Sequence, residues 1–253
     1  MKTALITGAT SGIGLEMAVY LHKLGWKLIL TGRNEQMLQK MADRFGNDTR
    51  YIALDLAKRG APEALCAFCR GTRVDFLINN AGFGVYGPMT ETPLERDLAL
   101  IDVNIRALHI IMKHFLRQMD ARDSGHILNV GSIAGFSTGP LLSSYYASKN
   151  YVVRLTTAVR EELRHKGSRV RVSVLCPGPV DTNFNRRAGV TFSAPPADAR
   201  TVARYAIDHA LAGDCIIAPS PLIWLGIAAM HVCPETLAAR VIYHVQKRKQ
   251  TIR

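Results

Sequence analysis

The chain has 253 residues, of which 48% are hydrophobic and 21% are charged, and its formal net charge at pH 7 is +12. This length and balance are typical of one globular domain with a sizeable core and exclude a disordered or low-complexity chain. The five cysteines are sparse and odd in number, which excludes a disulfide scaffold and indicates a reduced, cytoplasmic protein.

The first predicted element is a short buried strand over residues 3–7, followed by a glycine-rich turn and an amphipathic helix. The helix is expected to end near Leu24, before the helix-stopping Gly25. Glycines allow a tight turn, and a helix N-terminus presents free N–H groups to a pyrophosphate. This order therefore predicts a dinucleotide site with contacts from Gly8, Thr10, Ser11, Gly12, Ile13 and Gly14.

The second predicted strand, residues 26–31, indicates which dinucleotide is bound. NAD sites usually place an acidic residue on the ribose 2′-hydroxyl, about 20 residues beyond the glycines. Here Arg33 and Asn34 follow the strand, and no carboxylate precedes Glu35. Arg33 can hold a 2′-phosphate through charge-assisted hydrogen bonds, so NADP(H) is predicted in preference to NAD(H). The alternative is that Arg33 is a solvated residue at the start of a helix.

Further strand-like runs cover residues 51–54, 74–79, 126–130, 170–176 and 215–218, with helical patterns between them, notably over 94–119 and 144–165. This alternation predicts a single Rossmann-type α/β domain over residues 1–253, a doubly wound parallel sheet with helices on both faces. Ligands of such sheets bind at the carboxyl ends of the strands. The histidines and cysteines lack metal-ligand spacing, and Cys66 and Cys69 are interpreted as core packing.

Tyr145 and Lys149 are four residues apart, which places them one turn apart on the same face of a predicted helix. The ammonium group should lower the pKa of the phenol from about 10 towards neutrality, which would make Tyr145 a proton donor or acceptor. Ser132 precedes Tyr145 by thirteen residues. A carbonyl that accepts hydride develops negative charge on its oxygen, and the hydroxyls of Ser132 and Tyr145 can stabilise that charge.

Together these motifs resemble those of the short-chain dehydrogenase/reductase family, over roughly residues 3 to 218. The matching stretches are residues 7–14, 55–56, 79–82 and 177–182, with Asn104, Ser132, Tyr145 and Lys149. The resemblance implies that Ser132 binds the substrate carbonyl, that Tyr145 is the general acid/base, and that Lys149 lowers its pKa and holds the nicotinamide ribose. Asn104 is implied to hold a water of the proton relay. Implied cofactor contacts are Asp55, Leu56, Asn80, Ala81, Gly82, Asn104, Tyr145, Lys149, Pro177, Gly178, Val180 and Thr182.

The resemblance further implies a homodimer or homotetramer built on the helices over residues 94–119 and 144–165. Two positions depart from the family pattern or compete with it. Gly131 stands where a serine is frequent, which predicts a more flexible loop before Ser132. Tyr146 is a second phenol beside Tyr145, but it has no lysine four residues on and is interpreted as packing or as a wall of the substrate site.

Two segments carry the predictions about substrate and partners. Residues 181–197 resemble the family's substrate-covering loop, and their mixed side chains suit an apolar substrate with an acidic end; solvated arginines on a mobile lid are the alternative. These side chains are Phe184, Arg186, Arg187, Val190 and Phe192. Residues 219–253 extend beyond the resemblance as a predicted helical extension. Its apolar stretch over 222–230 is shorter than the about 20 residues that span a bilayer.

A helix from Pro234 in this extension would carry four apolar side chains on one side and a basic end. They are Leu237, Val241, Ile242 and Val245. Such a helix either packs over the substrate cleft or a subunit interface, or makes peripheral contact with an anionic membrane surface. The basic residues of the chain are otherwise dispersed and no nucleic-acid motif accompanies them, so nucleic acid is not a predicted partner.

The predicted function is hydride transfer between NADP(H) and a small carbonyl or alcohol substrate of an apolar or lipid-like kind, such as a ketone, a 3-oxoacyl thioester or a steroid. The alternatives are an NADP(H)-sensing binding protein without turnover and a membrane-surface scaffold acting through residues 219–253. The tyrosine–lysine pair favours the enzyme, because a sensor needs the glycine turn but not a proton donor.

Overall fold

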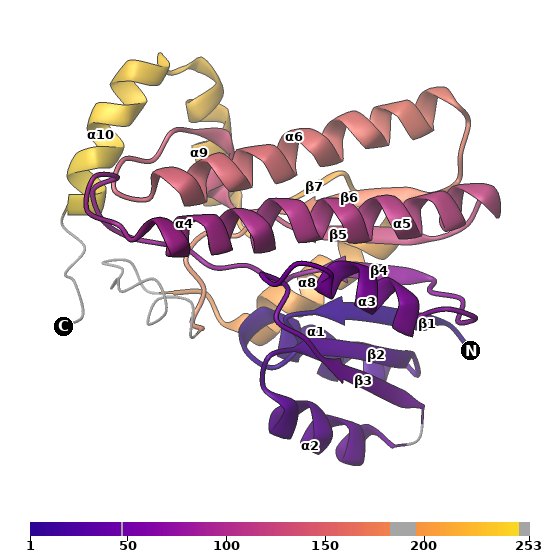
Figure 1. Ribbon diagram of the computed structural model, residues 1–253. Coiled ribbons are helices and arrows are strands. Elements are labelled where there is room, and N and C mark those ends of the chain that lie inside the picture. The colour runs from indigo at the N-terminus through magenta and orange to yellow at the C-terminus, as the bar shows by residue number, and fades with distance from the viewer. Residues whose placement is uncertain (47, 183–195, 248–253) are drawn as a thin grey trace.

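The computed structural model describes residues 1–46, 48–182 and 196–247 (Figure 1). Its centre is a seven-stranded parallel sheet in the order β3-β2-β1-β4-β5-β6-β7. The strands are β1 Thr3–Thr7, β2 Lys27–Gly32, β3 Thr49–Ala53, β4 Phe76–Asn79, β5 His126–Val130, β6 Arg171–Leu175 and β7 Ile216–Ile217. The order reverses between β1 and β4, which confirms the predicted doubly wound fold and makes their carboxyl ends the expected ligand crevice.

Helices cover both faces of this sheet because the side chains of each strand alternate between two cores. In β1, Leu5 belongs to the core under α3 (Ala61–Phe68), α5 (Leu108–Ala121) and α6 (Ser143–His165). Ala4 and Ile6 belong to the opposite core, under α1 (Gly12–Lys23), α2 (Glu35–Phe45) and α8 (Ala199–Ala212). Figure 1 shows α5 and α6 running side by side over the first of these faces.

The region over residues 94–119, predicted as one helix, is interrupted. It forms α4 (Leu94–Ile101), a π-helical turn (Asp102–Ala107) and then α5. The wider π turn changes which residues face the sheet and occurs frequently at functional sites. Asn104 lies inside it, 1% exposed. The π turn therefore contains Asn104, which the sequence analysis had named as a candidate site residue.

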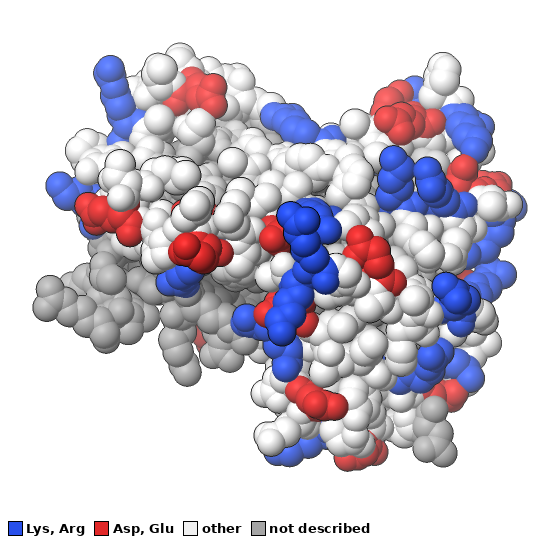
Figure 2. Space-filling model, in the orientation of Figure 1, with Lys and Arg blue, Asp and Glu red and all other residues white. Residues whose placement is uncertain are grey.

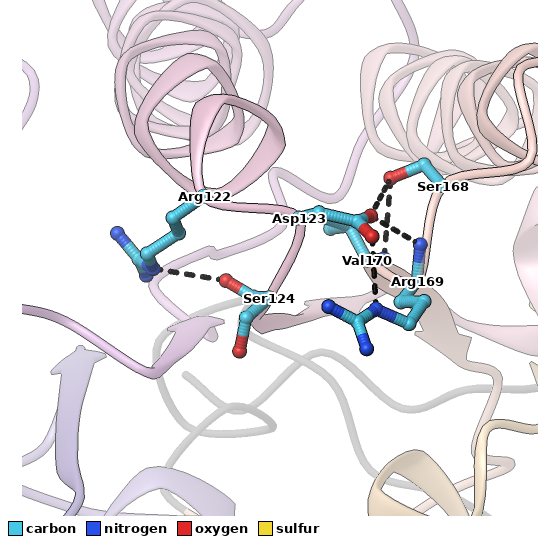
Figure 3. Close-up of polar contacts among 6 residues, drawn as sticks. All are labelled: Arg122, Asp123, Ser124, Ser168, Arg169 and Val170. Atoms are coloured by element: carbon cyan, nitrogen blue, oxygen red, sulfur yellow. Dashed lines mark hydrogen bonds and ion pairs between the residues drawn. The ribbon is translucent and has the colours of Figure 1, made fainter.

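A polar cluster joins two turns at the end of the sheet away from the carboxyl ends of the strands (Figure 3). Asp123 follows α5 in the left-handed region, with φ 48°. Its carboxylate accepts hydrogen bonds from the Ser168 hydroxyl (3.2 Å) and from the Arg169 backbone N–H (2.6 Å) and Nε (2.8 Å). The hydrogen bond from the Arg169 backbone N–H is the main cause of the lowered pKa of the Asp123 carboxyl. These contacts hold β5 and β6 in register, far from the ligand crevice.

The chain ends in two helices, α9 (Pro221–Val232) and α10 (Glu235–Lys247), which Figure 1 draws beside the amino end of α6. Ser220 caps α9 by accepting a hydrogen bond from the Leu222 N–H (3.2 Å), and Pro221 occupies the first turn, where its missing donor costs nothing. The described residues after 219 are therefore helical from Pro221 to Val232 and from Glu235 to Lys247. Within the described ranges, no helix combines the length and apolar character needed to cross a bilayer.

Candidate active site

A cavity of about 740 Å³ opens at the carboxyl ends of the strands, a size typical of ligand pockets. All but two of the predicted cofactor and catalytic residues line it. They are Gly8, Thr10, Ser11, Gly12, Ile13, Arg33, Asn34, Asp55, Leu56, Asn80, Ala81, Gly82, Ser132, Tyr145, Lys149, Pro177, Gly178, Val180 and Thr182. The exceptions, Gly14 and Asn104, lie behind its wall. The structure thus brings segments from the whole length of the chain to one place.

The turn after β1 needs its glycines. Gly8 and Gly12 have φ of 66° and 55°, a conformation that side-chain-bearing residues rarely adopt. Asn80, from the end of β4, fixes the turn by donating from Nδ2 to the carbonyl oxygens of Thr7 (2.9 Å) and Gly8 (3.1 Å). A Cβ at Gly14 would overlap both Asn80 Nδ2 and the Gly8 oxygen. Gly14 therefore acts through this close approach and not as part of the cavity wall.

The amino end of α1 is open to an anion. The side chain of its N-cap residue, Ser11, makes no capping hydrogen bond, so the first-turn N–H groups lack that partner. A Cβ at Gly12 would come within 2.8 Å of Thr182 Cγ2, which keeps the space between the turn and the loop after β6 narrow. The glycine cradle, the free helix end and the cavity together fit a dinucleotide.

The residues predicted for the ribose and adenine end lie at the rim. Arg33 is exposed, borders the cavity and makes no hydrogen bond or ion pair with any described residue. Asn34 has a structural role, because its Oδ1 caps α2 by accepting from the Met37 N–H (3.0 Å). Asp55 Oδ1 likewise accepts from the Ala57 N–H (3.1 Å). The guanidinium of Arg33 is therefore the group at this end that is left available for a 2′-phosphate.

Ser132 and Tyr145 meet at the other end of the cavity. Ser132 follows β5 and caps a short 3₁₀ helix, Ile133–Phe136, by accepting from the Ala134 N–H (3.1 Å). Asn150 in α6 ties this segment to the helix by donating to the carbonyl oxygens of Ala134 (3.2 Å) and Ser137 (2.8 Å). The Ser132 hydroxyl is thereby held within hydrogen-bonding reach of the Tyr145 phenol.

The expected lowering of the Tyr145 pKa is wrong for this structure. Burial raises the pKa of Tyr145 to about 12, and the hydrogen bond with Ser132 offsets only part of that effect. Lys149 Nζ lies 5.8 Å from the centre of the Tyr145 ring and donates to the Val130 carbonyl oxygen (2.8 Å). Burial also lowers the pKa of Lys149 to about 8. Sequence spacing could not reveal this, because removal from water penalises both charged forms.

Asn104 lies behind the cavity wall and is not part of its lining, and its predicted cofactor contact stays a prediction. Its Oδ1 accepts from the Phe83 N–H (3.1 Å), and its Nδ2 donates to the Phe83 carbonyl oxygen (3.0 Å) and to Ser148 Oγ (3.0 Å). These bonds fasten the loop after β4 to α6, one residue before Lys149. A Cβ at Gly82 would lie 3.1 Å from Asn104 Oδ1 and 3.4 Å from Lys149 Nζ. The predicted water-holding role of Asn104 remains a prediction.

Gly131 is closely packed. It is buried beside β6, and a Cβ there would come within 2.8 Å of Val174 Cγ2 and 3.1 Å of the Leu175 carbonyl oxygen. A larger residue would require these neighbours to shift, and the predicted flexibility of the loop stays a prediction. Cys66 and Cys69 are buried in the core, and burial raises their thiol pKa values to about 11 and 12, which supports their interpretation as packing residues.

Packing over the substrate cleft was one of the positions expected for the last helix, and Val245 and Gln246 of α10 form part of the cavity lining. Sequence reasoning missed Gln246 itself. Gln246 is 2% exposed and donates from Nε2 to the Tyr146 hydroxyl (2.8 Å), while the Tyr86 hydroxyl donates to its backbone oxygen (3.1 Å). Its Oε1 is buried without a hydrogen-bond partner among the described residues. No local motif marks a glutamine near the end of a helix. Tyr146 forms part of the wall, as expected.

The predicted substrate loop, residues 181–197, is described only at its ends. Val180 pairs with Ala197 in an isolated parallel bridge, and the Asp181 N–H donates to the Ala197 carbonyl oxygen (2.9 Å). Residues 183–195, with all five side chains singled out from the sequence, lie outside the described residues.

Comparisons with known proteins agree with this geometry. The family model "short chain dehydrogenase" matches residues 2–191. An uncharacterized oxidoreductase of Staphylococcus saprophyticus is 34% identical over 82% of this chain and 92% of its own. A short-chain dehydrogenase of Sphingobium yanoikuyae in complex with NADPH has a TM-score of 0.82 at 26% identity, covering 94% of this chain and 99% of its own. One from Burkholderia phymatum in complex with NAD has a TM-score of 0.81 at 27% identity, covering 91% and 92%.

Proposed function

The chain belongs to the short-chain dehydrogenase family and is an oxidoreductase of the nicotinamide-dependent kind, and we propose that it is an NADPH-dependent reductase of an apolar carbonyl compound, or the corresponding alcohol dehydrogenase in reverse. The observation that carries the proposal is the convergence of Ser132, Tyr145 and Lys149 on the cavity that also contains the glycine turn. The bound dinucleotide supplies the hydride that adds to the carbonyl carbon.

Tyr145 supplies the matching proton in the proposed reaction. Its phenol donates to the carbonyl oxygen as that oxygen gains charge, and the product is the alcohol. The Ser132 hydroxyl donates a hydrogen bond to the same oxygen and is already oriented by its bond from the Ala134 N–H. A phenol with a pKa of about 12 is a weak donor to water, so transfer depends on the developing oxyanion and on a nearby cation.

Lys149 provides that cation. Its Nζ is buried, bonded to the Val130 carbonyl oxygen and aligned beside the Tyr145 ring. A pKa of about 8 keeps it mostly protonated at neutral pH. The ammonium stabilises the tyrosinate left after proton transfer, and a proton from solvent restores the phenol. In the oxidative direction the same groups take the proton from the alcohol.

The proposed preference for NADPH rests on Arg33. Among the described residues, three charged side chains line the cavity: Arg33, Asp55 and Lys149. Of these, Arg33 is the positively charged residue at the rim of the ribose end. We expect Arg33→Ala to raise KM for NADPH about 10- to 100-fold, because a charge-assisted contact to a phosphate is lost. KM for NADH should change little. Steady-state kinetics with both cofactors checks this, and an equal change for both would contradict the preference.

The substrate end of the cavity is mainly apolar, which supports a ketone, 3-oxoacyl or lipid-like substrate. Its lining there comes from the loop after β4, the π turn, the 3₁₀ helix, the N-cap of α6 and α10: Phe83, Val103, Ile133, Leu142 and Val245. Gln246 Oε1 is the exception, an unpaired buried acceptor in an apolar wall. Such an acceptor is costly unless a ligand supplies a donor. We therefore infer that a rotation of the Gln246 amide, which is buried in the cavity wall, lets it accept a hydrogen bond from a hydroxyl or N–H group of the preferred substrate, away from the reacting carbonyl.

Gln246→Leu tests this inference. We expect KM to rise about tenfold for ketones that carry a second hydroxyl or an amide N–H, and to stay unchanged or fall for ketones without such a group. The KM for NADPH should be unaffected. Lys247→Leu, at an exposed neighbouring position, is the matched control. An equal change in KM for both kinds of ketone would show that Gln246 only holds α10 in place.

The homo-oligomer expected from the family resemblance stays a prediction. Three exposed apolar side chains on α4, Leu94, Leu98 and Ile101, are 64%, 50% and 41% exposed and support an interface on the helices named for it. Apolar side chains of this kind are typical of the interfaces of obligate dimers.

A further inference from the structure

The end of the chain carries a concentrated apolar surface. Of the fourteen large hydrophobic side chains exposed in the described residues, eight lie on α9 and α10. They are Leu222, Trp224, Leu225, Val232, Leu237, Val241, Tyr243 and Val245. We call this set the α9/α10 surface. So many exposed apolar side chains on two consecutive helices are unusual on a soluble monomer and favour a binding face.

The side chains of α9 divide into a buried face and an exposed face. Ile227 is 3% exposed, and Ile223 and Met230 pack with it against the core below α6, so these positions form the inner face of the helix. Leu222 and Leu225, 75% and 67% exposed, lie on the other side. A helix that is apolar all round normally has cover on every side. Here the described residues cover α9 on one side only.

The α10 helix continues the surface to the mouth of the cavity. Gln246 and the half-buried Ile242 face the body of the protein. Leu237, Val241 and Val245 follow a neighbouring stripe at intervals of four residues and are 51%, 55% and 55% exposed. Val245 also lines the cavity. The exposed apolar stripe therefore runs along α10 to a residue of the cavity lining.

The charge of this region identifies the kind of partner. From residue 219 to 253 the sequence has five lysines and arginines and one acidic residue, Glu235. Two of the basic residues, Arg240 and Lys247, lie on α10 beside the apolar stripe. Elsewhere acidic and basic side chains intermingle, as the face drawn in Figure 2 shows. A second copy of the same surface would bring like charges together, whereas an anionic surface would neutralise them.

We propose that the α9/α10 surface docks on an anionic lipid membrane, with α9 lying in the interface plane. Exposed leucines and valines would enter the boundary between headgroups and acyl chains, and the basic side chains would contact the headgroups. Trp224, 44% exposed, and Tyr243 have the amphipathic rings that favour this depth. Docking places the cavity mouth against the lipid. That docking does not rest on the proposed function; only the delivery of an apolar substrate from the lipid would.

Sedimentation of the full chain with lipid vesicles tests the docking. We expect binding to vesicles of phosphatidylcholine with phosphatidylglycerol, weaker binding to phosphatidylcholine alone, and a decrease with added salt. The double variant Leu222→Asp with Leu225→Asp should bind about tenfold or more weakly. Leu24→Asp, an exposed leucine at the end of α1, is the matched control and should bind as the unmodified chain does. Circular dichroism and NADPH binding confirm that each variant is folded.

Fluorescence gives a second readout that reports depth. The chain has two tryptophans, so Trp26→Phe leaves Trp224 as the single reporter. The emission maximum of Trp224 should shift to shorter wavelength when anionic vesicles are added, and brominated lipid should quench this emission. The proposal is overturned by an absence of vesicle binding, or by binding that the double aspartate variant retains. If vesicles are not bound and the double variant dissociates a dimer, a second copy of the chain covers the α9/α10 surface in place of a membrane.

Discussion

Tyr145→Phe should lower kcat for carbonyl reduction about 10²- to 10⁴-fold while NADPH still binds. The substitution removes one hydroxyl from a site where it is the proposed proton donor, and general acid catalysis contributes a factor of this size. The phenylalanine ring keeps the packing of a side chain whose ring centre lies 6.2 Å from that of Tyr146. NADPH affinity from fluorescence titration and kcat from NADPH oxidation separate binding from chemistry.

Tyr146→Phe is the control for this experiment. Tyr146 bonds to Gln246 and belongs to the wall of the cavity, so its loss should alter KM for the carbonyl compound and leave kcat within a few-fold. If Tyr145→Phe kept full turnover and Tyr146→Phe lost it, the assignment of the proton donor would move to the neighbouring ring. If both kept full turnover, the proposed mechanism would be wrong.

Lys149→Met should lower kcat about 10²- to 10³-fold, because the tyrosinate formed in the reaction loses its buried cation. Methionine fills a similar volume without a charge and leaves the Val130 carbonyl oxygen without its donor. Lys113→Met, at an exposed position on α5, is the matched control and should not change kcat. Unchanged turnover in Lys149→Met would show that the cation has no part in the chemistry.

The same variant tests the lowered pKa of Lys149 through stability. Below about pH 8, Lys149 carries its proton in both the folded and the unfolded chain. Between about pH 8 and 10.5 the unfolded chain keeps the proton that the folded chain has lost, so the free energy of unfolding rises with pH. In cofactor-free protein, the difference between unmodified chain and Lys149→Met should rise by up to about 3 kcal/mol across this window.

Denaturant titrations at several pH values measure that difference. Tyr145 acts in the opposite direction at higher pH, because its raised pKa keeps it neutral in the folded chain while the unfolded chain ionises. Both proteins retain Tyr145, so its contribution cancels in the comparison. A difference that stays constant from pH 7 to 10.5 would contradict a lysine pKa of about 8.

The fold and the glycine turn could be predicted because local patterns determine them. Apolar runs, stop signals and the glycine spacing placed β1, β2 and β5 within about a residue of their observed bounds, inside the usual uncertainty of helix and strand ends. Tyr145 and Lys149 were recognised because a spacing of four on a helix brings side chains to one face. These signals need no knowledge of tertiary contacts.

The rest depends on contacts between segments distant in sequence. The π turn at Asn104, the close packing around Gly131 and the raised pKa of Tyr145 all arise from burial against other elements. Gln246 reaches Tyr146 across a hundred residues of chain, which no periodicity within α10 encodes. The amphipathic pattern predicted that helix α10 exists but not which of its sides faces the cavity.

The most direct test of the proposed function is NADPH oxidation by the purified full chain, with NADH in parallel, across ketones, aldehydes and 3-oxoacyl thioesters of graded polarity. The account predicts turnover with NADPH, fastest for an apolar ketone that bears a second hydrogen-bond donor, and much slower turnover with NADH. Equal rates with both cofactors would refute the role of Arg33. Absence of turnover with either cofactor, in protein shown to bind NADPH, would contradict the central claim that the chain is a carbonyl reductase.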